Sequence, residues 1–169
     1  MNNARLAFGF GVVVVTFVVV RLLLVEPVVV RQESMEPTLS DGDTAVVSKW
    51  CRWTGTWGRG DVVAVRSPVD GGLLVKRIVA TAGHRVGLRD GRLAIDGVAA
   101  PPDAASEAID GTYFGPVRVP AGAVFVMGDN RGRSVDSRKF GPVDEDDVVG
   151  CVVAVAWPPS HAGLVRGER

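Results

Sequence analysis

The chain has 169 residues, with 19 basic and 19 acidic side chains, so its formal net charge at pH 7 is zero. This length fits one soluble domain plus an anchor, and the balanced charge gives no indication of nucleic-acid binding. The 21 Gly and ten Pro residues predict many turns, which favours a β-rich domain.

The chain begins with a long apolar segment. Leu6 to Val25 is apolar except for Thr16 and Arg21, and its length is close to the ~20 residues that a helix needs to span a bilayer. Glu26-Pro27 is expected to end this helix. A cleaved secretory signal peptide is the alternative, but no Ala-x-Ala cleavage sequence follows. We therefore expect residues 1–27 to form a short N-terminal tail and an uncleaved single-pass anchor. The positive charges on its two sides barely decide its orientation, and the very short tail agrees with a cytoplasmic N-terminus.

Short strands are predicted throughout the rest of the chain. Each candidate is rich in Val or Ile and is bounded by Gly, Pro or Asp. The candidates are residues 44–49, 61–66, 73–80, 86–88, 92–95, 123–127 and 148–156. Asp90-Gly91 predicts a hairpin turn between two of them. No long amphipathic helix is predicted after residue 30, so we expect an all-β domain of mainly antiparallel sheets over residues 28–160.

Two segments of this domain carry little predicted structure. Residues 98–119 are rich in Pro, Ala and Gly and predict a surface loop, so residues 84–122 are expected to form a small hairpin and loop insertion. Residues 161–169 are expected to be a flexible tail. Cys51 and Cys151 have no metal-ligand spacing, and they can either form a disulfide outside the cytoplasm or pack as two small buried side chains. No metal or cofactor is predicted.

A serine and a lysine indicate possible chemistry. Ser34 lies in a Pro-containing turn, and Lys76 lies in the apolar run 74–79. A serine nucleophile needs a base, and a lysine can serve as one if burial lowers its pKa enough to keep it neutral. The chain has 16 Arg and only three Lys, and arginine cannot take this role because it does not deprotonate. The alternative is a lysine on the wet face of a strand, with its stem covering apolar surface.

The histidine and tryptophan residues suggest roles in catalysis, in loop packing or at a membrane interface. His84 and His161 lie at a strand end and in the tail, and neither is predicted to be catalytic. Trp50, Trp53 and Trp57 cluster after the strand that ends at Lys49. They can pack in a loop, or they can enter a membrane interface, where Trp is favoured.

Four motifs in order resemble bacterial type I signal peptidases, which are membrane-bound Ser-Lys proteases. The resemblance runs from Arg21 to about Pro158. The motifs are Ser34-Met35-Glu36-Pro37-Thr38-Leu39, Arg59-Gly60-Asp61-Val62-Val63, Val75-Lys76-Arg77-Ile78-Val79-Ala80, and Gly128-Asp129-Asn130-Arg131 with Ser134 to Arg138 and Gly141. The resemblance implies a compact β-fold shared with LexA-like proteins, behind one N-terminal transmembrane helix.

The resemblance also implies roles for single residues. Ser34 would attack the scissile carbonyl, and Lys76 would act as general base and return a proton to the leaving amine. Ser134 would orient the lysine by a hydrogen bond. Asp136 and Arg138 would form a structural ion pair near the site. Asp129 would support the site in a way that the sequence does not specify, and Arg77 is expected to point away from the lysine pocket.

One position departs from the family pattern. Family members often have a small residue, such as Ser, two positions before the nucleophile, where its hydroxyl helps form the oxyanion hole. This chain has Gln32 there, so its amide, or the Ser34 backbone N–H, would have to serve. Shallow apolar pockets for small substrate residues at −1 and −3 are matched by Val28, Val30, Met35, Leu39, Ala64, Leu74 and Val75.

The expected function is removal of signal peptides from preproteins at the outer face of the cytoplasmic membrane. The substrate is expected to bind as an added strand beside residues 28–32 and 73–75. Expected partners are preproteins, membrane lipid and the secretion translocon, with no nucleic acid and a monomeric enzyme. Alternatives are a specialised Ser-Lys processing or self-cleaving peptidase, and a non-catalytic anchored β-domain that binds peptides.

Overall fold

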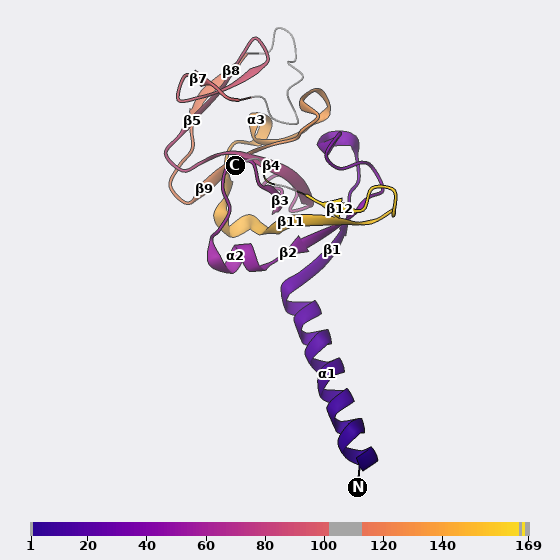
Figure 1. The fold of residues 1–169 in the computed structure, drawn as a ribbon. Helices are drawn as coiled ribbons and strands as arrows, with labels where there is room; N and C mark the ends of the chain where they lie inside the picture. Colours follow the sequence, from indigo (N-terminus) through magenta and orange to yellow (C-terminus); the bar gives the residue numbers. More distant parts are fainter. Residues whose placement is uncertain (1, 102–112, 166, 168–169) are drawn as a thin grey trace.

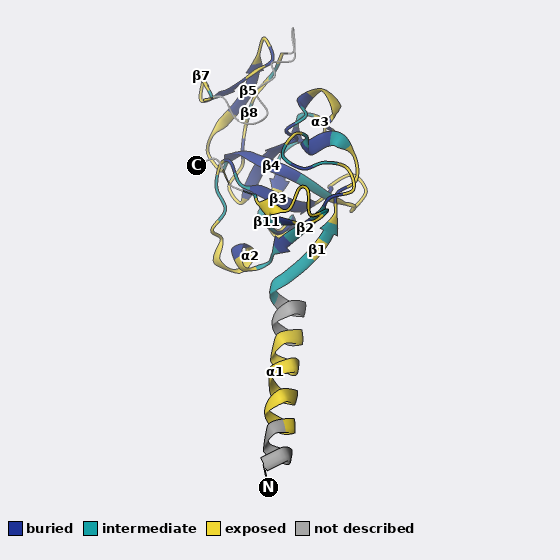
Figure 2. Cartoon of the chain, turned by 45° about the vertical axis from the view of Figure 1, so that its right-hand side comes forward, coloured by how far each residue is buried: buried dark blue, intermediate teal, exposed yellow. Residues whose placement is uncertain are grey.

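The computed structural model describes residues 2–101, 113–165 and 167, but in the first helix it describes the side chains of residues 7–18 and 24 only. That helix, α1 (Asn2–Leu24), projects from one end of a β domain (Figure 1). Its described side chains are almost all exposed (Figure 2). None of the helices in the described residues is long and apolar enough to cross a membrane. The side chain of Arg21 lies outside the described residues.

Most strands belong to one antiparallel sheet. Its order is β1-β2-β11-β3-β4-β9-β10, with β12 paired to β11. Its strands are β1 (Val25–Val29), β2 (Thr44–Ser48), β3 (Val62–Arg66), β4 (Leu73–Thr81), β9 (Ala123–Met127), β10 (Val143–Asp144), β11 (Val148–Trp157) and β12 (Gly163–Leu164). The buried positions of these strands are mostly Val, Ile and Ala, which suit a pleated, packed surface.

A second, four-stranded antiparallel sheet stands at the end of the molecule away from α1 (Figure 1). Its order is β7-β6-β5-β8. Its strands are β5 (Arg85–Arg89), β6 (Arg92–Ile95), β7 (Val98–Ala99) and β8 (Phe114–Arg118). The predicted Asp90-Gly91 turn joins β5 to β6, and both of its residues have positive φ angles. Such angles fit a tight hairpin turn, so this prediction is confirmed.

Helices are few and short. The β domain contains α2 (Trp50–Thr54) and α3 (Ser137–Phe140), together with the 3₁₀ segments η1 (Glu33–Met35), η2 (Arg131–Arg133) and η3 (Glu145–Asp147). The Asp136 carboxylate caps α3 by accepting a hydrogen bond from the Arg138 backbone N–H. The predicted all-β class, with mainly antiparallel sheets, is therefore confirmed for the domain.

Several elements differ from the prediction. β1 begins at Val25, so the β domain starts before residue 28. β8 lies in the segment expected to be a loop. Pro116 is tolerated there because β8 is an edge strand. β12 lies in the expected flexible tail and pairs with β11. Residues 102–112 of the expected loop lie outside the described residues.

Cys51 and Cys151 form a disulfide that joins α2 to β11, across a Cα–Cα distance of 6.1 Å. Of the two possibilities left open by the sequence, the pair is therefore a crosslink rather than two separate buried thiols. It ties together segments 100 residues apart in the chain.

Candidate active site

Ser34 lies in η1, just after the edge strand β1, and is only 6% exposed. Its neighbour Met35 and nearby Leu39 are fully buried in the cluster between β1, β2, β3 and β11, so they anchor the turn. The Asn130 backbone N–H donates a hydrogen bond to the Ser34 carbonyl oxygen. The serine is therefore held from both sides, by core packing and by a distant loop.

Lys76 lies in β4, opposite Val63 of β3, and is 3% exposed. Its Nζ is 2.8 Å from Ser34 Oγ, which is hydrogen-bond distance, and 3.1 Å from the Val75 carbonyl oxygen. The structure thus brings together two residues that are 42 positions apart. Because the Lys76 side chain is buried, it does not lie on a solvent-exposed face of β4, which was the alternative interpretation of the sequence.

Burial lowers the pKa of Lys76, because the ammonium form loses its hydration. The carboxylates of Asp136 and Asp129 act in the opposite direction, and burial outweighs them. A lysine with a lowered pKa is neutral in a larger share of molecules near neutral pH. In that form its lone pair can accept the proton of the Ser34 hydroxyl.

A buried ion pair joins the lysine strand to the loop after β9. Arg77 donates from Nε and a terminal nitrogen to both Asp129 carboxylate oxygens, at 2.8 and 2.6 Å. Thr38 Oγ1 also donates to Asp129 and accepts from Arg77. Arg77 further donates to the Gly60 carbonyl. Because Arg77 follows Lys76 and Thr38 follows Ser34, this network links both segments that carry the pair.

Asp136 and Arg138 form a second ion pair beside the site, as expected from the motif. Arg138 donates to both oxygens of the fully buried Asp136 side chain, each at 2.8 Å, and to the Arg131 carbonyl. Asp136 also accepts from the Gly128 backbone N–H. Burial by itself would raise the pKa of Asp136, but the hydrogen bonds and charge of Arg138 outweigh it, so the pKa is lowered.

Ser134 lies against Gly128, close to the Ser34 main chain. A methyl group placed on Gly128 would collide with Ser134 Oγ and with the Ser34 carbonyl oxygen. Ser134 Oγ is buried beside the Asp136 carboxylate, and the contact of its hydroxyl helps to lower the pKa of Asp136. The structure therefore brings this serine to the site but shows no hydrogen bond from it to Lys76.

Gln32 precedes η1 and has an unusual backbone conformation, with φ at 80°. Its backbone N–H donates to Asp41 Oδ1 at 2.7 Å, and the residue is exposed. Positive φ is uncommon outside Gly, so the turn imposes a cost here that the Asp41 contact offsets. The Asp41 carboxylate therefore helps to fix the turn that leads to Ser34.

Most residues predicted to line the substrate pocket share one cluster. In this cluster Met35 of η1 packs with residues of β1, β2, β3 and β11. It contains Val28, Val30, Met35, Leu39, Ala64 and Val75. Leu74 differs, because it packs with Val63 and Ile78 in a separate cluster. The remaining six lie together beside the serine.

Each of the two histidines contacts an aspartate away from Ser34. His84 contacts exposed Asp96 at 2.7 Å, and His161 contacts buried Asp43 at 2.9 Å. Neither contact involves Ser34, in agreement with the interpretation that they are not catalytic.

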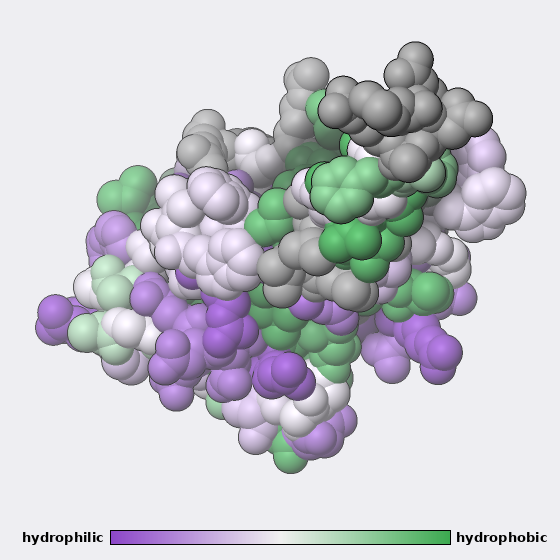
Figure 3. Space-filling view, turned by 90° about the horizontal axis from the view of Figure 1, so that it is seen from below, coloured by the Kyte–Doolittle hydropathy of each residue, from purple (hydrophilic) through white to green (hydrophobic). Residues whose placement is uncertain are grey.

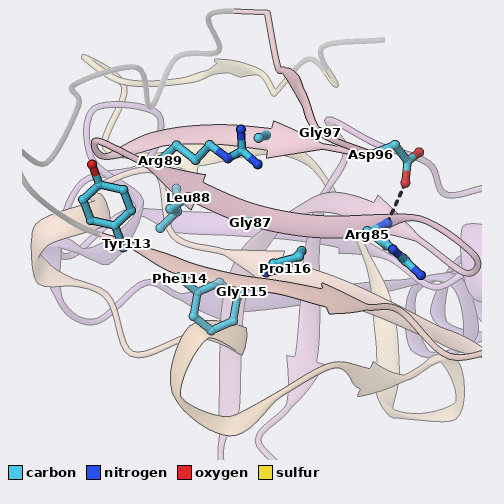
Figure 4. Close-up of a pocket in the computed structure, with 11 residues that line it drawn as sticks. Arg85, Gly87, Leu88, Arg89, Asp96, Gly97, Tyr113, Phe114, Gly115 and Pro116 are labelled. Carbon is cyan, nitrogen blue, oxygen red and sulfur yellow. Dashed lines mark hydrogen bonds between the residues drawn. The ribbon is translucent and has the colours of Figure 1, made fainter.

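A hollow of about 480 Å³ lies on the small sheet. Figure 4 shows Arg85, Arg89 and Tyr113 around it, with Gly87 and Pro116 on the strands beneath. The groups around it include neither a Ser-Lys pair nor a buried base.

Sequence reasoning missed the joint role of Thr38, Arg77 and Asp129. The available indication was that Asp129 is itself a predicted supporting residue and that Arg77 follows Lys76 in the sequence. The expectation that Arg77 would lie away from the lysine pocket agrees with its contacts, since it bonds Asp129, Thr38 and Gly60 rather than Lys76. The pairing spans 52 positions, so no local pattern indicates it.

Comparison with known proteins places this chain in a family. The family model described as signal peptidase, peptidase S26, matches residues 3–157. The chain is 38% identical to signal peptidase I of Bacillus licheniformis, over 87% of this chain and 84% of that protein. It is 37% identical to signal peptidase I T of Bacillus subtilis strain 168, over 93% and 88%.

A solved structure agrees with these relatives. The crystal structure of a signal peptidase I from Enterococcus faecalis V583 is 33% identical and has a TM-score of 0.52, covering 57% of this chain and 97% of that one. The antiparallel β domain thus has a counterpart in a solved signal peptidase I. The chain belongs to the signal peptidase I family of S26 peptidases.

Proposed function

We propose that this protein is a membrane-bound serine endopeptidase that removes signal peptides after small residues at −3 and −1. The observation that carries the proposal is the 2.8 Å distance between Ser34 Oγ and Lys76 Nζ in a buried setting. Membership of the signal peptidase I family supports signal peptides as the substrate class.

The reaction begins when neutral Lys76 accepts the Ser34 hydroxyl proton as Oγ attacks the scissile carbonyl. The resulting ammonium then donates that proton to the amine nitrogen as the peptide bond breaks, which leaves an ester on Ser34. Water attacks the ester, Lys76 again takes a proton, and Ser34 recovers it when the signal peptide leaves. No metal or cofactor takes part in these steps.

The surrounding residues assist the pair. Asp136–Arg138 and Asp129–Arg77 hold the loop after β9 against the Ser34 segment, which keeps Oγ and Nζ in register. Ser134 Oγ, buried beside Asp136, is proposed to turn toward Lys76 and orient it when substrate binds. The Ser34 backbone N–H and the side-chain amide of Gln32 are the proposed donors to the oxyanion.

Substrate binds as an added strand in this proposal. β1 is the edge of the large sheet, and β4 pairs with β9 only from Arg77 onward. The Leu73–Val75 segment therefore has one edge without a described strand, so its main chain is available to a peptide. The apolar cluster beneath Ser34, which includes Met35 and Ala64, supplies the floor for small −1 and −3 side chains.

Residues 1–27 serve as the anchor in this proposal, with the N-terminus inside and residues 28–160 on the outer face of the cytoplasmic membrane. Its support is the projecting helix α1, whose described Phe and Val side chains are exposed to the surroundings. Preproteins, lipid and the translocon are the proposed partners of a monomeric enzyme.

Two other functions fit less well. A non-catalytic peptide-binding domain has no need for a buried lysine at hydrogen-bond distance from a serine. A specialised Ser-Lys processing peptidase shares the chemistry, and it would be distinguished by failing to cleave ordinary preproteins.

The test is cleavage of a preprotein with an Ala-x-Ala site by the detergent-purified full chain. We expect the parent to cleave, and Ser34→Ala and Lys76→Arg to lose activity by about 10⁴-fold or more, as when a nucleophile or its base is removed. Lys76→Arg keeps the positive charge but cannot accept a proton, so it separates base chemistry from charge.

A matched control is Lys139→Arg, which changes a lysine outside the site in the same way. Activity that survives in Lys76→Arg would contradict the Ser-Lys mechanism. A folded parent that leaves the preprotein intact would favour the specialised peptidase.

A further inference from the structure

The end of α1 and the start of α2 are held together. β1 and β2 pair antiparallel with Val25 opposite Ser48, so β2 returns to the point where α1 ends. The Lys49 backbone N–H donates to the Leu24 carbonyl at 2.8 Å, and Lys49 Nζ pairs with Glu26 at 2.9 Å. α2 therefore begins beside the last turn of the projecting helix, as Figure 1 shows.

α2 has one outward and one inward face. Trp50 and Trp53 are three positions apart, so they share a face of the helix, and they are 59% and 58% exposed. Their rings contact edge to face, with centroids 6.5 Å apart. Cys51 points the other way, is buried, and is bonded to Cys151 of β11. The disulfide thus fixes the side on which the two indoles are presented.

Loop packing accounts for Trp57 but not for the other two. Trp57 packs against the core cluster that contains Val63 and Ile78. Trp50 and Trp53 leave more than half of their surface exposed, although an indole is a large apolar group. Trp is enriched where a protein meets the headgroups of a membrane, because its ring is apolar and its N–H is polar.

Charge around α2 indicates what kind of surface it meets. Arg52 of α2 lies near Glu145 and Asp146, and these three residues line one hollow together with Trp53 and Trp57. The mixed signs do not favour a strongly anionic partner. The face seen from below carries both hydrophobic and hydrophilic side chains (Figure 3), and the exposed Phe and Val side chains of α1 are among its hydrophobic groups.

We propose that α2 is a second membrane contact, with Trp50 and Trp53 seated in the interfacial layer of the bilayer that α1 enters. This inference rests on the proposed anchoring by α1. The occupant is the zwitterionic headgroup region, reached through the indoles rather than through charge. The Cys51–Cys151 crosslink holds the contact rigid relative to β11, so the sheet that carries Ser34 keeps one orientation to the membrane.

The test uses the full chain in phosphatidylcholine vesicles with brominated acyl chains, which quench nearby Trp fluorescence. Three variants retain a single tryptophan, Trp50, Trp53 or Trp57, and carry Phe at the other tryptophan positions. We expect the emission of Trp50 and Trp53 to fall by about half or more relative to unbrominated vesicles, as for indoles at the headgroup–acyl boundary. The emission of Trp57, the matched control, should stay unchanged.

Vesicle flotation tests the anchoring by α1 separately from the interfacial contact of α2. If the chain floats with the vesicles but Trp50 and Trp53 are not quenched more than Trp57, the interfacial contact is wrong while the anchor stands. If the chain does not float, the anchoring by α1 falls, and the inference falls with it. Preprotein cleavage by each variant checks that the fold survives the Phe substitutions.

The crosslink is tested in the same vesicles by reducing the folded protein with dithiothreitol and by Cys51→Ser/Cys151→Ser. We expect the difference in quenching between Trp50 and Trp57 to shrink when the disulfide is open, because α2 is then free to tilt. An unchanged difference in both samples would overturn the orienting role of the disulfide.

Discussion

The Ser34–Lys76 region and the small sheet differ in how their polar groups are held. Around the serine, the side chains of Arg77, Asp129 and Asp136 are buried. Arg77 donates a hydrogen bond to Asp129, and Asp136 accepts one from the Gly128 backbone N–H. On the small sheet, the His84–Asp96 contact has both side chains about half exposed. A hollow lies on the small sheet, and the buried Lys76 is not among the residues that line it. Desolvation therefore distinguishes the proposed reactive site, because burial lowers the pKa of Lys76.

The largest expected effect is on the buried ion pair. Arg77→Met leaves Asp129 as an uncompensated buried charge, so the free energy of unfolding should fall by about 3–5 kcal/mol. Denaturant unfolding of the full chain in detergent measures this. The control Arg133→Met removes an exposed pair with Glu33 and should cost less than about 1 kcal/mol. Equal losses in the two variants would erase the distinction between buried and surface pairs.

The next effect concerns the close contact at Gly128. Gly128→Ala places a methyl against Ser134 Oγ and the Ser34 carbonyl, so the serine must shift. A displacement of about 1 Å costs about 100-fold in rate, and we expect kcat/KM to fall by that amount. Gly132→Ala is the control, because its methyl would meet nothing and its φ is ordinary. Full activity in Gly128→Ala would show that the Ser34 position is not held through this contact.

The pH dependence of activity sharpens the electrostatic side of the comparison. Since Lys76 must be neutral to act, kcat/KM should rise with pH through its lowered pKa. Asp136 favours the ammonium form, so Asp136→Asn should lower the pKa of Lys76 further and move the acid limb to lower pH. Rates of preprotein cleavage across pH, corrected for folded protein, measure the shift. Movement to higher pH would contradict the assigned electrostatics.

The smallest effect is expected on the small sheet. Arg89 is exposed beside the hollow of Figure 4, and Arg89→Ala should change kcat/KM by less than about twofold, as for most surface substitutions. Preprotein cleavage measures this against the parent. A loss of more than tenfold would give the hollow a part in the reaction and would break the comparison.

Local patterns predicted much of the fold. β6 (Arg92–Ile95) and β9 (Ala123–Met127) have the predicted bounds, and the Asp90-Gly91 turn lies where its residues require positive φ. β1 and β12 were missed. β1 has Pro27 and continues an apolar run, and β12 is a two-residue strand whose pairing depends on β11. Neither strand is visible without its partner.

What the sequence determined by itself was chemical and local: the serine turn at Ser34, the lysine in an apolar run, and strands bounded by Gly and Pro. These depend on side-chain type and on neighbours within a few residues. Only the tertiary structure decided that Arg77 pairs with Asp129, that Cys51 bonds Cys151, and that Ser134 lies against Gly128 beside the Ser34 main chain. Such contacts join distant parts of the chain, and their geometry depends on how the sheets and loops pack.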